Sequence, residues 1–259
     1  MKRWLVTVAV VFVSLTPVRA DVTVVQTMKI EGAMVEALLA PVPRVTMRIK
    51  GQKSRAEIDT NGQVVTSIVD LAAGQVIFLD STTKTATITT PASAAGSAPK
   101  MNIALKPTGK TQAIGGHQCE EHVMTTSMPM AQYVGGHVTP EEVKDGRMVM
   151  DGSIWIARSA PGAAEFTAFN QAAMKSNLLS PVAGLMPGGF GKLLEAAAVA
   201  PGMPYLTELA MSFEGTGPIV DLMKQMGPMK MVQKVASVAT DPVADDLFTI
   251  PAGYTVEKE

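Results

Sequence analysis

The densest cluster of chemically capable side chains consists of His117, Cys119, Glu120, Glu121 and His122. On a β-strand, successive side chains point to opposite faces. His117, Cys119 and Glu121 then share one face, and the two remaining residues share the other. Imidazole and thiolate suit copper or zinc, so His117 and Cys119 form a candidate metal pair that needs a third ligand from another strand. The interpretation we favour is that Cys119 is a small buried hydrophobic residue.

Nucleophilic catalysis needs a base oriented beside a cysteine or a serine. His117 is only two residues from Cys119, and His122 lies on the opposite face of the same predicted strand. His137 follows a glycine pair in a predicted loop, and the sequence contains no Gly-x-Ser-x-Gly elbow. The glycine pairs also lack the strand-loop-helix pattern of a phosphate site. We therefore predict no enzymatic activity and no cofactor.

Methionine is unusually frequent, with 18 in the chain. Six of them form M-x-M pairs: Met128 with Met130, Met148 with Met150, and Met229 with Met231. Residues two apart on a strand share a face, and thioethers select soft ions such as Cu(I). A metal site would draw on Met223, Met226, Met229 and Met231, or on His117 and Cys119. Flexible methionines also fill irregular cores and line adaptable apolar grooves, which is the interpretation that we favour.

Residues 1–20 have the pattern of a secretory signal peptide. Two basic residues precede an apolar run over residues 4–15, and a small residue, Ala20, marks the expected cleavage site. The run is too short to span a bilayer, and we predict no transmembrane segment. Cleavage would place residues 21–259 in the periplasm or outside the cell.

Composition excludes several classes of protein. With 47% hydrophobic and 17% charged residues, the chain can bury a core, which argues against disorder. The single cysteine cannot form an internal disulfide. Without the signal, 19 basic and 23 acidic residues leave a formal net charge of −4. No block of like charges occurs, so a nucleic-acid surface has no support.

Alternation with period two predicts many short strands. In the first third they cover residues 23–31, 44–50, 54–59, 63–70, 75–80 and 83–90. Their pattern predicts an antiparallel meander with one face in water. A connection without periodicity at residues 91–100 follows, rich in alanine and serine.

Further strands and the helices are expected after this connection. Strands are predicted at residues 101–105, 110–114, 117–127, 151–158, 204–214 and 229–240, and helices at residues 161–177, 190–200 and 218–226. On the first helix, Phe166, Phe169, Ala173 and Met174 share a face. The order of strands, helices and strands predicts an α+β fold, with helices on one face of a curved antiparallel β-sheet.

Two segments resemble a known family. They are residues 239–242 with 245–254 (ATDP and DDLFTIPAGY), and residues 109–111 with 114–121 (GKT and IGGHQCEE). They resemble an exported bacterial family built around a domain of unknown function, similar in architecture to the lipoprotein-localisation carrier (LolA/LolB-like) superfamily. The resemblance implies one domain over residues 21–259, folded as a half-open barrel with helices covering the concave face. Within the first segment, we expect Phe248, Ile250 and Tyr254 to anchor to the core, and Asp245 and Asp246 to cap a turn.

We therefore expect an exported, monomeric binding protein for a lipid, an acyl chain, a lipoprotein or another hydrophobic partner. The residues expected to line its cavity are Met28, Met47, Phe78, Phe166, Phe169, Leu193, Leu194 and Met211. Two alternatives stay open: the handling of Cu(I) or Ag(I) through methionine pairs, and a structural role in the cell envelope.

Overall fold

The computed structural model describes residues 20–32, 44–60, 62–90, 105–133, 139, 141–179, 200–225 and 227–258. Its strands are β1 (Val22–Glu31), β2 (Arg44–Lys50), β3 (Lys53–Thr60), β4 (Gln63–Asp70), β5 (Gln75–Asp80), β6 (Thr85–Thr89), β7 (Lys106–Ile114), β8 (His117–Pro129), β9 (Arg147–Ala157), β10 (Met203–Glu214), β11 (Met229–Ala239) and β12 (Thr255–Lys258). The helices of these described ranges are α2 (Met130–Tyr133), α3 (Ala163–Lys175) and α6 (Pro218–Gln225), and residues Asp245–Phe248 form the 3-10 turn η3.

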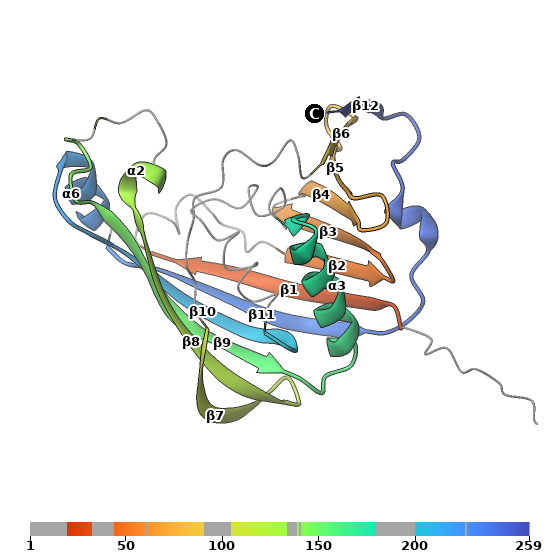
Figure 1. Cartoon of the computed structure of the whole chain (residues 1–259), viewed down its shortest axis with the longest axis horizontal. Coiled ribbons are helices and arrows are strands. Elements are labelled where there is room, and N and C mark those ends of the chain that lie inside the picture. The colour runs from red at the N-terminus through yellow and green to blue at the C-terminus, as the bar shows by residue number, and fades with distance from the viewer. Residues whose placement is uncertain are drawn as a thin grey trace, which may run out of the picture.

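The twelve strands of the described residues form one open, curved sheet (Figure 1). Their order is β12-β6-β5-β4-β3-β2-β1-β11-β10-β9-β8-β7. All neighbours pair antiparallel except β12 and β6, which are parallel. The predicted antiparallel meander is therefore confirmed for β2 to β6. In the described part of the chain, no helix has the length and hydrophobicity needed to cross a bilayer.

Local alternation predicted several elements closely. β2, β4 and β5 have the expected bounds, and α6 begins at Pro218 as predicted. The last residue of that predicted helix, Met226, lies outside the described residues. β9 instead begins at Arg147, because its Met148 and Met150 continue the buried alternation. The connection at 91–100 and most of the helix predicted at 190–200 lie outside the described residues.

One face of the sheet, here named the inner face, carries Val22, Val24 and Ile49. Val22 pairs with Ile49, so their side chains lie on the same side of β1 and β2. Phe166 and Phe169 of α3 belong to the same buried cluster as these residues. α3 therefore packs against the inner face, as the predicted apolar stripe required. Met174 is the exception: it was expected on this stripe, but it is 39% exposed.

The opposite, outer face is also buried over β4, β5 and β6. Residues 241–254, named the strap here, run across this face. Val243 and Phe248 of the strap form a cluster with Ile68, Ile77 and Leu79 of the sheet. The expectation of a face left in water is therefore wrong here, because β4 and β5 present apolar side chains to both sides. The expected anchoring of Phe248, Ile250 and Tyr254 is confirmed.

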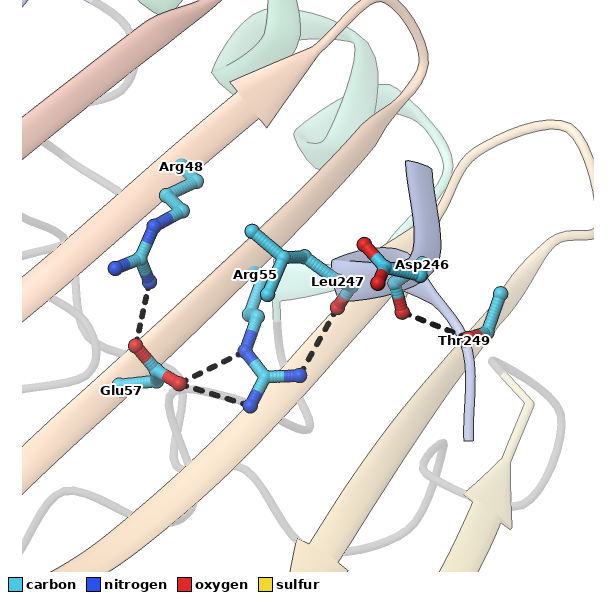
Figure 2. Close-up of polar contacts among 6 residues, drawn as sticks. All are labelled: Arg48, Arg55, Glu57, Asp246, Leu247 and Thr249. Carbon is cyan, nitrogen blue, oxygen red and sulfur yellow. Dashed lines mark hydrogen bonds and ion pairs between the residues drawn. The ribbon is translucent and has the colours of Figure 1, made fainter. Parts of the chain in front are cut away.

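Basic side chains of β2 and β3 hold the strap by its backbone. Arg55 Nη1 donates to the carbonyl oxygen of Leu247 at 2.9 Å (Figure 2), and Lys50 Nζ donates to that of Val243 at 2.7 Å. Lys50 also forms an ion pair with Asp245 at 2.8 Å. η3 has no side-chain cap, so the expected capping role of Asp245 is wrong: its carboxylate binds Lys50 instead.

Glu57 fixes the position of Arg55. Its carboxylate accepts hydrogen bonds from Arg48 and from Arg55 Nε, the latter at 2.9 Å (Figure 2). Burial by itself raises the pKa of Glu57, but the hydrogen bonds and charges of the two arginines lower this pKa below its ordinary value. Glu57 therefore acts on the strap through Arg55, whose guanidinium it holds beside the carbonyl oxygen of Leu247.

We expect Glu57→Gln to destabilise the protein by about 1–3 kcal/mol at neutral pH, because it leaves two arginines without their carboxylate. A lowered folded-state pKa stabilises above the unfolded value and loses that contribution as pH falls through the folded value. The deficit relative to wild type should therefore shrink below about pH 4. Urea unfolding at several pH values measures this difference in the free energy of unfolding.

The control is Glu120→Gln, which breaks the exposed pair with Arg158 and should change the free energy of unfolding by at most about 1 kcal/mol. A deficit that stays constant with pH would contradict this assignment.

Candidate functional site

Methionines gather on the inner face of β8 to β11. The strand register places Met150 opposite Met211, and Met211 opposite Met229. We call residues that lie opposite one another across the strands a row. In the row next to this one, Met128 of β8 lies opposite Met148 of β9. Directly opposite residues have Cβ atoms about 4.5–5.5 Å apart. The M-x-M pairs, which are far apart in the sequence, therefore meet side by side on one surface.

This surface, named the methionine face here, is a single apolar cluster. Seven of its methionines are buried: Met124, Met128, Met130, Met148, Met150, Met211 and Met231. Three more, Met28, Met223 and Met229, are partly buried and pack against it. It thus gathers ten of the methionines that the structure describes. The partly buried members come from β1, α6 and the start of β11, and they mark the margin of the face.

Gly152 lets β9 and β10 approach closely beneath the methionine face. It lies opposite Leu209 in the register, between Met124 on β8 and Leu209 on β10. A Cβ atom at this position would lie 2.0 Å from the carbonyl oxygen of Glu208 and 2.9 Å from the Cα of Leu209. Glycine within a strand often marks such close contact between backbones. Only a residue without a side chain fits there.

Polar side chains separate the methionine face from the part of the inner face beneath α3. Gln233 Nε2 donates to Gln26 Oε1 at 2.8 Å, joining β11 to β1. Thr207, opposite Gln233 on β10, is buried. Gln233 follows Met231 of the methionine face by two residues and precedes Val235 of the helix-covered cluster. The inner face therefore has two apolar regions.

The predicted cavity residues divide between these two regions. Met28 and Met211 belong to the methionine face. Met47, Phe78, Phe166 and Phe169 belong to the cluster covered by α3. Leu193 and Leu194 lie outside the described residues. The structure therefore does not bring the described members of the predicted set together in one cluster.

The predicted metal ligands also divide. Met223, Met229 and Met231 contribute to the methionine face, whereas Met226 lies outside the described residues. Cys119 is completely buried in the cluster that contains Trp155 and Tyr205. The predicted burial of Cys119 is therefore confirmed.

The surroundings of Cys119 are apolar and aromatic. Burial raises the pKa of its thiol, because it disfavours the thiolate. The ring of His117 lies 5.0 Å from that of Tyr205, at a tilted angle. Glu121 binds Thr108 Oγ1 at 2.8 Å and Lys110 at 3.3 Å. The described residues contain no cluster of three or more His, Cys, Asp or Glu side chains with metal-binding geometry.

A shallow cavity of about 330 Å³ lies beside α3, and none of its lining residues belongs to the methionine face. Its lining consists of Arg158, Ala163, Ala164, Thr167, Ala168, Gln171, Pro201 and Gly202. The one charged side chain among them, Arg158, forms an ion pair with Glu120 at 2.7 Å. Thr167 Oγ1 accepts a hydrogen bond from the backbone N–H of Gly202 at 2.8 Å. This hydrogen bond ties α3 to the residue that precedes β10.

No protein family and no curated protein matches the sequence. Among solved structures, the chain is similar to an uncharacterised conserved protein from Thermus thermophilus. Identity is 8% and the TM-score is 0.40, over 93% of this chain and 92% of that one. It is also similar to the lipoprotein LppX of Mycobacterium tuberculosis, with 10% identity and a TM-score of 0.31, over 86% and 88% of the two chains. The family resemblance of the two segments, residues 239–242 with 245–254 and residues 109–111 with 114–121, stays a prediction.

Proposed function

We propose that the chain is an exported, monomeric binding protein without enzymatic activity, whose methionine face takes up an acyl chain or another hydrophobic partner. The observation that carries this proposal is the gathering of ten methionines into one cluster on four paired strands and their neighbours. The signal pattern of residues 1–20 supports export.

Methionine suits such a surface for physical reasons. Its unbranched side chain has three rotatable bonds and a polarisable sulfur, so it fits partners of different shape. Surfaces rich in methionine repack around several ligands more readily than surfaces of branched residues. Met28, Met223 and Met229 at the margin are only partly buried. We place the entrance for an acyl chain there.

The first experiment identifies the occupant. Native mass spectrometry of protein purified from the envelope of its own cells should detect a bound lipid, which delipidation removes. Detection of the bare chain alone, together with no binding of added lipid, would overturn the proposal.

The second experiment locates the binding surface. A fatty acid such as palmitate, at about 100 times its dissociation constant, should stabilise the delipidated protein by about 2.7 kcal/mol. Met150→Gln should weaken this effect, because it introduces a polar amide into the methionine face. Met203→Gln is the matched control, since Met203 is equally buried but belongs to the cluster covered by α3. Thermal unfolding measures both. If palmitate stabilises Met150→Gln but no longer stabilises Met203→Gln, lipid does not bind on the methionine face.

A further inference from the structure

We propose that Met150, Met211 and Met229 form a binding site for a soft monovalent cation, Cu(I) or Ag(I). The site lies within the methionine face that we propose for lipid, but its ligand is an ion held by sulfur atoms. It differs from the ligand set expected from the sequence because only one of these residues, Met229, belonged to that set. The geometry that points to it is the direct cross-strand pairing of three methionines on β9, β10 and β11.

Met211 is the central ligand of this row. Neighbouring strands lie about 4.8 Å apart, so an ion held between Met211 and one flanking methionine lies within about 5 Å of the Cβ atom of each. Each flanking thioether can cover this distance, because the methionine side chain turns freely about three bonds. Met211 can therefore share an ion with Met150 or with Met229.

The chemistry of the row determines the class of ion. Thioether ligands are soft and neutral, which favours Cu(I) and Ag(I) over harder divalent ions. The row directly on one side, Met128, Met148 and Phe213, is also apolar. The row on the other side continues with Leu209 and Met231. Met150 and Met211 are buried, whereas Met229 is partly buried at the margin and gives the ion a route to them.

Neutral ligands also give the site a distinctive dependence on pH. Cysteine and histidine must lose a proton to bind a metal, so sites built from them weaken as pH falls. A thioether has no proton to lose. The affinity of the row should therefore stay the same between about pH 5 and pH 7.5. A site at Cys119 would instead weaken in acid, the more so because burial already raises the pKa of this thiol.

The test measures Ag(I) binding, since this ion needs no reductant. It uses the full mature chain carrying Cys119→Ala, which removes the competing thiol. Native mass spectrometry should show one tightly bound Ag(I), and titration against a competing chelator should give equal affinities at the two pH values. Met211→Leu, a substitution that conserves volume, should reduce the affinity at least about tenfold. Met203→Leu should leave it unchanged, because Met203 is a buried methionine outside the row.

Three results would overturn the proposal: no tight Ag(I) in the Cys119→Ala chain, equal losses in Met211→Leu and Met203→Leu, or an affinity that falls in acid. Lipid binding is measured separately with palmitate, on protein without added metal. A failure of Ag(I) binding therefore leaves the lipid proposal standing, and a failure of lipid binding leaves the metal site standing.

Discussion

Replacing Gly152 by alanine should lower the free energy of unfolding by about 3 kcal/mol, at the upper end of the range for overpacking. The added Cβ atom would lie 2.0 Å from the carbonyl oxygen of Glu208. That oxygen belongs to the backbone of β10, so no side-chain rotation relieves the clash. β10 must move away from β9, and the pairing that positions Met211 beside Met150 must shift with it.

Thermal and urea unfolding of Gly152→Ala measure this effect. Ser153→Ala is the control, because it changes the next residue of β9, on the opposite face, and adds no atom to the contact. The control should stay within about 0.5 kcal/mol of wild type. If Gly152→Ala unfolds at the wild-type midpoint, β9 and β10 are not as close as the structure places them. Ag(I) binding by this variant should weaken as well, since the row depends on the same register.

Phe248→Ala should cost about 3–5 kcal/mol, the usual range for removing a buried aromatic ring. Phe248 is 4% exposed and lies in the cluster that seals the outer face of the sheet. Its loss leaves a cavity against Ile77 and Leu79. The hydrogen bond from Arg55 to the carbonyl oxygen of Leu247 holds the strap backbone in place. The strap therefore cannot collapse into the cavity, and the variant should lose the full amount of about 3–5 kcal/mol.

Hydrogen exchange distinguishes loss of the strap from general weakening. In Phe248→Ala, amides of β12 and β6 should exchange faster than those of β9 and β10, because the strap leads directly into β12. Leu222→Ala is the matched control: it truncates a large apolar side chain that is 58% exposed, and its effect on stability should be small. Equal destabilisation by the two substitutions would contradict the anchoring role of Phe248.

Local patterns in the sequence predicted individual strands and helices better than they predicted which of them lie side by side. Alternation located β2, β4 and β5, and the apolar stripe of Phe166 and Phe169 predicted the buried side of α3. These signals work because each depends only on a period within one element. The same reasoning put Met174 on the buried stripe. The period of a helix does not show how far along that stripe the contact with the sheet extends.

The candidate site was beyond such reasoning. M-x-M spacing indicates that two methionines share a face, but it contains no information about which strands become neighbours. The row of Met150, Met211 and Met229 exists because β10 lies between β9 and β11 in the sheet. That order places Met150 opposite Met211, about 60 positions later in the chain, which only long-range pairing can determine.

β12 was missed for a related reason. Its residues Thr255–Lys258 are exposed and show no apolar alternation. Their strand conformation comes from parallel pairing with β6, a partner far away in the sequence. Parallel pairing requires a long crossover connection, and here the strand returns to this edge after the chain has passed through every other strand of the sheet.

Because β12 is the last strand of the chain, β6 must wait for it until synthesis is nearly complete. During synthesis β6 emerges long before β12, and in that interval the hydrogen-bonding edge of β6 and the apolar outer face of β4 and β5 have no cover. Unpaired strand edges template association between chains, and nascent proteins with exposed apolar surface are prone to it. We therefore expect the strap and β12 to cover this edge and this face last, and a chain that ends before Asp241 to aggregate more readily than the full chain.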